Sequence, residues 1–149
     1  MEEAARSTAV GPERSPFTYL FSAGEKAMFI FEKLQVYQRA LGFAEKASTL
    51  TTGFPRGCWY LADQLNRASL SISLNIAEGN GRWTEADRRN FFGIARGSVH
   101  ECVPLIELCH RKGLIAEDVC SECRAELEAI AKMLSGLMKG GHRPRAVAE

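Results

Sequence analysis

The chain has 149 residues, of which 46% are apolar and 25% are charged, and its formal net charge is +1 at pH 7. This length and apolar content predict one folded domain and exclude a chain that is disordered by composition. The near-neutral balance excludes a strongly basic nucleic-acid-binding domain, so any site for nucleic acid must be a local patch.

Residues 1–28 are predicted to form a flexible N-terminal tail, because they combine glycine, proline and small residues without a sustained period. They contain no continuous apolar run, so we expect no secretory signal peptide. Met28 directly precedes the first periodic segment, which raises the hypothesis that translation starts there. Mass spectrometry of the native protein would refute that hypothesis by detecting residues before Met28. The folded domain is expected to span residues 29–139, and a second flexible tail residues 140–149.

The cysteine content and the hydropathy of the chain indicate in which compartment of the cell the protein is expected. The chain has five cysteines, and no window approaches the ~18 consecutive apolar residues of a membrane span. An odd number of cysteines without an export signal predicts reduced thiols and a cytoplasmic protein.

The first predicted helix covers about residues 31–51. Its apolar side chains recur at steps of three and four, which is the period of an amphipathic helix with one buried stripe. A turn signal at residues 53–57 (GFPRG) then ends the helix. The predicted buried positions are Leu34, Tyr37, Leu41, Ala44, Ala47 and Leu50.

Residues 58–78 carry two competing patterns. Residues 69–76 (SLSISLNI) alternate with the period of a strand, but a helix is favoured because no turn separates them from the helical residues before them. As a helix, the segment leaves Leu70 and Leu74 outside the buried stripe, which predicts a second neighbour such as another subunit. Glycines at 79 and 81 are expected to end it, since glycine adopts the left-handed conformation found past helix ends. The predicted buried positions are Leu61, Leu65, Ala68, Ile72 and Ile76.

The third predicted helix begins after Thr84, a good N-cap, and continues to about residue 112. Gly93 and Gly97 each cost ~1 kcal/mol relative to alanine inside a helix, which predicts a close helix crossing there. Pro104 lacks a backbone donor and predicts a kink. The predicted buried positions are Phe91, Ile94 or Ala95, Ser98, Cys102, Leu105 and Cys109.

The fourth predicted helix covers about residues 117–139 and is followed by Gly140 and Gly141. Four helices with short connections predict an all-α fold, an antiparallel up-down-up-down four-helix bundle. The predicted buried positions of this last helix are Val119, Cys123, Leu127, Ile130, Leu134 and Leu137.

Three motifs in order carry a family resemblance: residues 31–37 (FEKLQVY), 75–82 (NIAEGNGR) and 91–98 (FFGIARGS). They resemble the four helix bundle protein family linked to intervening sequences in bacterial 23S rRNA genes, also called the S23 ribosomal protein family. The resemblance covers about residues 29–139. It implies an antiparallel bundle that assembles as a homo-oligomer, often a pentameric ring, with no attached enzymatic activity. A related branch assists the reverse transcriptase of diversity-generating retroelements, where nucleic-acid contact is expected.

The chain departs from the family at two positions. Family members often carry proline where this chain has Ser73, and Pro104 lies in a stretch that is usually plain helix.

The first candidate site is a group of arginines near the second connection and along the third helix. Arg89 and Arg96 are seven residues apart on one helix face, with Phe92 between them. Guanidinium groups pair with phosphates and an aromatic ring stacks on a base, so this pattern indicates nucleic-acid binding. The alternative is a solvated face in which Glu85 pairs with Arg89. The candidate residues are Arg82, Arg88, Arg89 and Arg96.

The second candidate is a polar network of Asn75, Glu78 and Arg96, which all lie in the family motifs. Polar groups on mostly apolar helices can form a satisfied network that sets helix register, and we favour this role over catalysis.

A metal site is the third candidate. Cys109, His110, Cys120 and Cys123 could converge, and thiolate and imidazole suit zinc. Zinc-binding CxxC pairs usually occupy a tight turn, however, and Cys123 falls on the predicted core stripe, where cysteine acts as a small apolar residue. No cofactor is therefore predicted, and no hydrolase or nucleotide-binding motif is present.

These patterns predict a non-enzymatic homo-oligomer that binds RNA or a nucleic-acid enzyme through the arginines. The alternative is a scaffolding oligomer with a protein partner and no nucleic-acid binding.

Overall fold

The computed structural model describes residues 29–140, and this part of the chain is helical without any strand. The prediction of an all-α fold with four helices is confirmed. The predicted tails, apart from Gly140, lie outside the described residues. The elements are the short 3-10 helix η1 (Ile30–Lys33), α1 (Gln35–Thr51), the 3-10 helix η2 (Arg56–Cys58), α2 (Trp59–Asn80), α3 (Glu85–Arg111) and α4 (Glu117–Met138).

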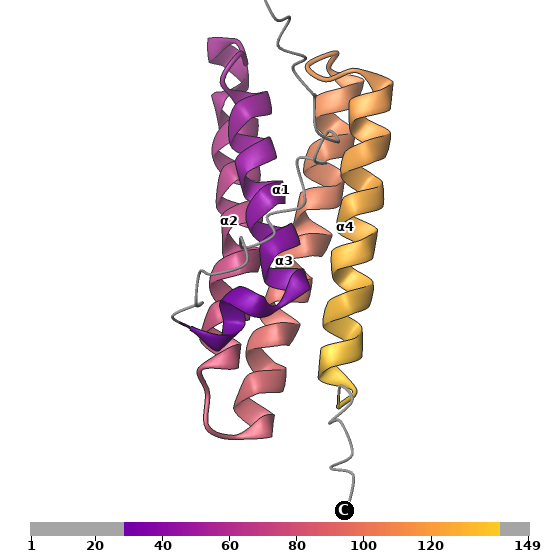
Figure 1. Ribbon diagram of the computed structural model, residues 1–149. Helices are drawn as coiled ribbons and strands as arrows, with labels where there is room; N and C mark the ends of the chain where they lie inside the picture. The colour runs from indigo at the N-terminus through magenta and orange to yellow at the C-terminus, as the bar shows by residue number, and fades with distance from the viewer. Residues whose placement is uncertain (1–28, 141–149) are drawn as a thin grey trace, which may run out of the picture.

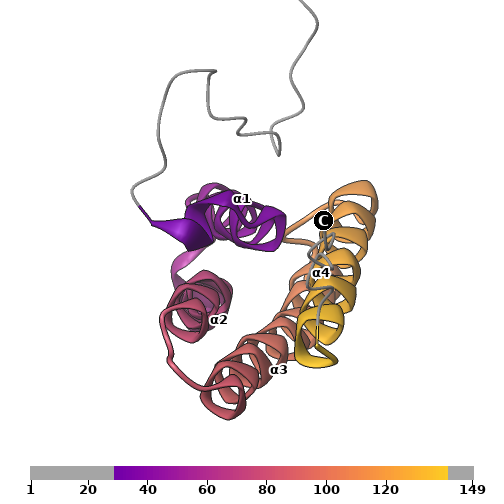
Figure 2. The ribbon, with the colours of Figure 1, turned by 60° about the horizontal axis from the view of Figure 1, so that its bottom comes forward.

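Consecutive helices lie side by side (Figure 1). The α2–α3 turn is at the lower end of the view, where α1 also begins and α4 ends, and the other two turns are at the upper end. Figure 2, turned so that the lower end comes forward, shows the four helices around a common interior. None of the helices between residues 29 and 140 has the length and apolar content to cross a membrane.

The interior is a single apolar core to which every α-helix contributes. Removal of this apolar surface from water is the main force that holds the helices together. The largest fully buried side chains are Phe43, Leu61, Leu65, Ile72, Ile76, Val99, Ile106, Leu127, Ile130 and Leu134.

Helix α1 shows one error of the sequence prediction. Leu41 is 42% exposed, whereas Phe43, which the predicted stripe omitted, is fully buried. The buried side runs instead through Val36, Ala40, Phe43 and Ala47. Both stripes have helical spacing and share Ala47, so periodicity alone could not distinguish them.

Helix α2 forms across the residues with strand-like alternation, as predicted, and all five of its predicted core positions are buried. Ser69 and Ser73 are buried too, and each hydroxyl donates to the carbonyl three residues earlier, at 3.1 and 3.0 Å. Leu70 and Leu74 remain 47% and 58% exposed. Serines on the core side therefore account for the misleading alternation.

The end of α2 differs from the prediction. The helix continues to Asn80, and Gly81 has a φ of −82°, so the left-handed conformation expected there is absent. Gly79 is inside the helix and buried, where an added Cβ would lie 3.0 Å from the Cβ of Phe91 and from the ring of Phe92. Gly79 thus allows a close approach of α3. A left-handed glycine does follow α3, at Gly113 with a φ of 72°.

Helix α3 begins as predicted, with the Asp87 amide donating to the Thr84 hydroxyl at 3.1 Å. It continues through Pro104 to Arg111. A Cβ at Gly97 would meet nothing within 4 Å, and one at Gly93 would meet only Met138 of α4 at 3.5 Å. The close crossing predicted at both glycines is therefore absent at Gly97 within the described chain.

Two ion pairs connect α1 to α4, the helix pair with the least mutual contact around the bundle. Arg39 forms a two-pronged pair with Glu126, at 2.8 and 3.2 Å, and Glu126 is only 11% exposed. Lys46 donates to Glu122 at 2.7 Å.

Candidate nucleic-acid interface

The turn between α2 and α3 is short and held by hydrogen bonds on both sides. The Gly81 amide donates to the Ala77 and Glu78 carbonyls, and the Arg82 amide donates to the Gly79 carbonyl. On the other side, Thr84 caps α3. These bonds fix the backbone on either side of Trp83.

Arg82 is the first of three exposed arginines at this end. Its guanidinium forms an ion pair with Glu78, one helical turn earlier, and lies over the ring of Phe91 at 4.4 Å from the ring centre. A cation over an aromatic face is attracted to the negative potential of the ring. Arg82 is therefore held in one orientation.

Arg88 and Arg89 are exposed residues near the start of α3. Arg88 donates to the Asn80 carbonyl at 3.3 Å, which leans its side chain back over the turn. Neither arginine forms an ion pair with a carboxylate between residues 29 and 140, so the predicted Glu85–Arg89 pair is absent. We call Arg82, Arg88 and Arg89 the basic end.

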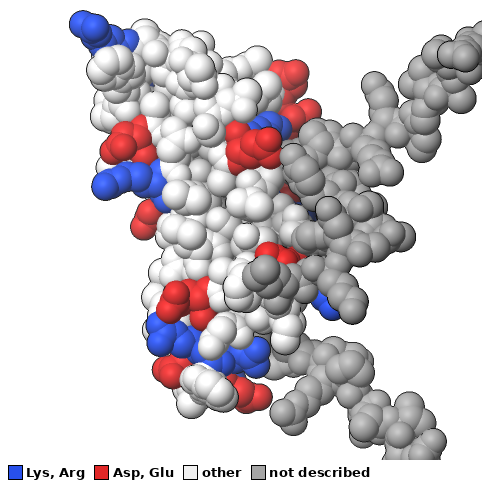
Figure 3. All heavy atoms as spheres, turned by 60° about the vertical axis from the view of Figure 1, so that its left-hand side comes forward, with Lys and Arg blue, Asp and Glu red and all other residues white. Residues whose placement is uncertain are grey.

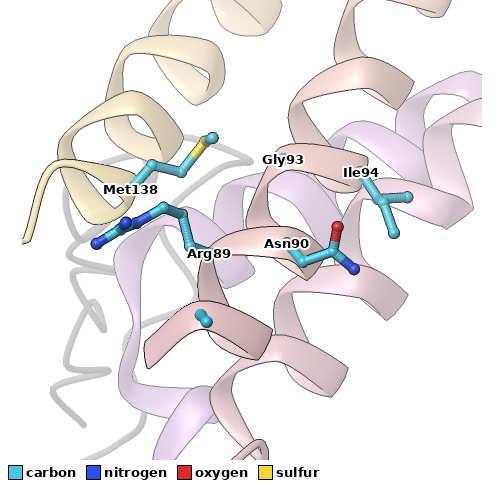
Figure 4. Close-up of a pocket in the computed structure, with 6 residues that line it drawn as sticks. Arg89, Asn90, Gly93, Ile94 and Met138 are labelled. Carbon is cyan, nitrogen blue, oxygen red and sulfur yellow. The ribbon is translucent and has the colours of Figure 1, made fainter. Parts of the chain in front are cut away.

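Arg89 also lines an open hollow of about 510 Å³ between α3 and the end of α4. Figure 4 shows Arg89 extending toward Met138 of α4, while Asn90 and Ile94 point the other way. Arg89 is thus an exposed residue at the edge of this hollow.

The structure separates the fourth predicted arginine from this group. Arg96 is partly buried, and its Nε donates to the Ser135 hydroxyl of α4 at 3.0 Å. Phe92, the predicted stacking aromatic, is only 7% exposed because it packs into the core beside Gly79. Arg96 serves helix packing here, and Phe92 is too buried to stack on a base.

The predicted polar network takes a different form. The Asn75 amide donates to the Ser71 carbonyl and hydroxyl, and the Ser71 hydroxyl is 2.8 Å from that of Ser98 on α3. Glu78 is half-exposed and pairs with Arg82 instead. The Ser71–Ser98 hydroxyl pair, with the Asn75 amide beside it, therefore joins α2 to α3, and Glu78 and Arg96 are not part of it.

Sequence reasoning missed Trp83. Its side chain is 100% exposed, and it lies directly between Arg82 and the Thr84 cap. A single aromatic in a turn has no period, so only its position beside arginine could have drawn attention to it.

Acidic residues are interspersed with the basic end. Figure 3 looks onto the side of the bundle that carries α2, where uncharged atoms dominate and basic and acidic atoms lie together at the lower end. The acidic residues of this stretch of sequence are Glu78, Glu85 and Asp87.

Four of the five cysteines belong to the core, and Cys58 is partly buried at its edge. Cys102, Cys109 and Cys123 are fully buried and Cys120 is 5% exposed. Burial raises the pKa of the Cys102 thiol to about 12 and also raises the pKa of Cys109 and Cys123. Within residues 29–140, no three histidine, cysteine or acidic side chains are placed to hold a metal ion.

The fold and the site together define a small helical-bundle protein with a basic turn at one end. The chain belongs to the 23S rRNA-intervening sequence protein family, whose sequence profile matches residues 32–136, more than half of the chain. The resemblance seen in the three motifs is thus confirmed.

A solved crystal structure has a similar fold. It is a protein of unknown function from the S23 ribosomal protein family of Bacteroides thetaiotaomicron, with 23% sequence identity and a TM-score of 0.65. The match covers 70% of this chain and 98% of that one. At this identity the likeness shows the fold alone. A comparison with curated proteins found no match.

Proposed function

We propose that this chain is a non-enzymatic, cytoplasmic and homo-oligomeric protein, an antiparallel up-down-up-down four-helix bundle that binds RNA through the basic end. One observation carries the RNA part of the proposal. Arg88 and Arg89 are both exposed, and neither forms an ion pair with a carboxylate in the described chain. Such guanidinium groups remain available for phosphate oxygens, which they bind through two parallel hydrogen bonds.

The position of the basic end supports the same proposal. The helix dipole gives the start of α3 a partial positive charge, which Glu85 and Asp87 in its first turn offset only in part. Arg82 and Arg88 are already held in place by Phe91 and the Asn80 carbonyl. Less side-chain freedom is therefore lost when a phosphate binds.

The test is binding of a labelled RNA hairpin to the wild type and to a variant with Arg88→Ala and Arg89→Ala, across a salt titration. Each phosphate that the protein neutralises releases a counterion, so wild-type affinity should fall steeply as salt rises. The variant should bind more weakly, and its slope of log K against log salt should be shallower by roughly one for each phosphate that it no longer neutralises.

Arg111→Ala with Lys112→Ala is the matched control, because it removes two adjacent basic residues at the opposite end of α3. This control should bind like the wild type. Absence of binding by the wild type at low salt, or equally weakened binding in both variants, would contradict the proposal. Arg96 is left intact, since its replacement would break the hydrogen bond to Ser135.

An exposed apolar strip supports the homo-oligomer. Leu70 and Leu74 flank Ser71 on α2, and Ile94, 45% exposed, is one turn before Ser98 on α3. Because Ser71 and Ser98 are hydrogen-bonded, these apolar side chains lie at the same level of the bundle. A second copy of the chain that covered this strip would remove it from water.

Light scattering tests the assembly. The family resemblance leads us to expect five subunits, so the mass should be about five times the 16.5 kDa of one chain. Leu70→Glu should lower the mass, whereas Leu41→Glu, at a similarly exposed leucine of α1, should leave it unchanged. A wild-type mass of one chain would exclude the oligomer.

The same strip favours the second candidate function, a scaffold that holds a different protein. If the protein is such a scaffold, the wild type should bind its protein partner and no RNA. Leu70→Glu should then abolish binding of that protein partner.

A further inference from the structure

We propose that Trp83 is a stacking platform for an unpaired nucleobase, so that the basic end selects single-stranded RNA segments over duplex. This inference rests on the proposed function, because it specifies which form of RNA the basic end would take.

The exposure of Trp83 is the first observation. It is the most exposed of the large apolar side chains between residues 29 and 140, at 100%. Tryptophan carries the largest apolar surface of any side chain and is well buried on average. An indole with both faces in water therefore offers a large flat surface that the bundle does not use for its own packing.

The second observation is that the backbone that carries this ring is held in place. Residues on both sides of Trp83 are fixed by the backbone hydrogen bonds from Gly81 and Arg82 and by the Thr84 cap. The turn therefore keeps the attachment point of the ring at the basic end. A ring on a fixed backbone loses less entropy on binding than a ring on a mobile loop.

Charge beside the ring is the third observation. Arg82 precedes Trp83 in sequence and is positioned over Phe91, and Arg88 leans back to Asn80 at the end of α2. Sites for single-stranded nucleic acid combine these two parts: aromatic rings that stack on bases and cations that follow the phosphates.

The chemistry favours a single strand over a duplex. Base faces inside a duplex are stacked on one another and inaccessible to a side chain, whereas loops, bulges and single strands present them. Stacking on an aromatic ring is tolerant of sequence, since every base has a flat face. Trp83 should thus confer selectivity for unpaired bases without strong base preference.

The chain contains its own control. Trp59 is the only other tryptophan, and it too is exposed, at 59%, with the Arg56 guanidinium 5.5 Å from its ring centre. It begins α2, whereas Trp83 follows the end of that helix, so about 33 Å of helix separates them. The two residues match in type and each has an arginine within three residues before it in sequence, but they occupy opposite ends of α2.

Fluorescence can report each end separately. In Trp59→Phe the remaining emission comes from Trp83, and in Trp83→Phe it comes from Trp59. The probes are a single-stranded RNA of about 10 nucleotides, within the usual site sizes for single-strand binding, and a duplex of the same strand with its complement. We expect the single strand to quench the emission of Trp83 and to leave that of Trp59 unchanged.

Affinity supplies the second readout. Trp83→Ala should weaken single-strand binding roughly tenfold or more, with Trp83→Phe restoring most of it, because phenylalanine also stacks. Duplex affinity should change little in either variant, and Trp59→Ala should bind both probes like the wild type. Light scattering should give Trp83→Ala the wild-type mass.

The outcomes separate the two proposals. If the wild type binds neither probe at low salt, the RNA function itself fails. If it binds RNA through Arg88 and Arg89 but Trp83→Ala binds as well as the wild type, or binds both probes equally weakly, only the stacking inference fails. A lower mass for Trp83→Ala would also overturn the inference, because it would make Trp83 a subunit contact.

Discussion

Gly79 shows how one residue fixes the contact between two helices. Its missing side chain leaves room for the Cβ of Phe91 and the ring of Phe92, which an added Cβ would approach to 3.0 Å. The sequence indicated a glycine at a helix end, but not that the helix continues past it. Only the position of α3 reveals the role of Gly79.

Gly79→Ala should destabilise the protein. Overpacking costs about 1–3 kcal/mol, whereas alanine regains only about 1 kcal/mol of helix propensity, so the net loss should be about 1 kcal/mol. Urea denaturation followed by circular dichroism measures it. Gly136→Ala, in α4 with nothing within 4 Å of the new Cβ, should be neutral or stabilising. Equal stability of the two variants would contradict the close approach.

Cys102 should make stability depend on alkaline pH. Desolvation by burial, with smaller contributions from Glu101 and Cys123, raises the pKa of its thiol from 9.0 to about 12. The unfolded chain therefore releases this proton from pH 9 upward, while the folded protein keeps it until about pH 12. The free energy of unfolding should fall across this window.

Urea denaturation between pH 8 and 11 would check this expectation, with the slope of the unfolding free energy against pH as the readout. In Cys102→Ala the fall should be shallower, although the baseline stability is lower because of the small cavity. An unchanged slope would show that other groups account for the loss.

At the scale of helices, prediction succeeded where one apolar stripe dominates. In α4, Cys123, Leu127, Ile130 and Leu134 are all buried as expected, since no second stripe competes with them. In α1 two stripes have helical spacing, and packing against α2 and α4 selects the one with Phe43. Tertiary contacts thus decide what periodicity leaves open.

The ion pair between α1 and α4 should contribute to stability more than those on the surface. Glu126 is 11% exposed and accepts two bonds from Arg39. Glu126→Gln should therefore lose about 1.5–3 kcal/mol, the usual range for hydrogen bonds to charged groups. Glu128→Gln, which breaks an exposed pair with Lys132 within α4, should lose much less, because solvent screens a pair in which both side chains are exposed. Thermal denaturation of Glu126→Gln, Glu128→Gln and Arg39→Ala measures these losses. Equally small losses of stability in all three variants would contradict a larger contribution from the Arg39–Glu126 pair.

The candidate site was predictable only in part. Residue type and spacing identified Arg82, Arg88 and Arg89, but sequence could not show that Arg96 donates to Ser135 or that Phe92 is buried. Those facts depend on where α4 and the core lie. The ring that stays in water, Trp83, belongs to no periodic pattern.

For the molecule as a whole, assembly should appear as concentration-dependent stability. If copies bind one another only when folded, the melting temperature should rise with protein concentration. In a variant with Leu70→Glu and Leu74→Glu it should be lower and independent of concentration, because charges on the apolar strip oppose association. Differential scanning calorimetry over a hundredfold range of concentration measures both. A flat wild-type profile would indicate a stable monomer.

The placement of the two ends of the described chain has a practical consequence. Figure 2 shows η1 and the end of α4 at the same end of the bundle as the α2–α3 turn. A fluorescent protein joined directly to residue 29 or to residue 140 would therefore be attached at the end that carries Trp83 and the basic end. An insertion at Gly53, an exposed glycine with nothing within 4 Å of an added Cβ, would place such a reporter in the α1–α2 turn, at the far end of the molecule.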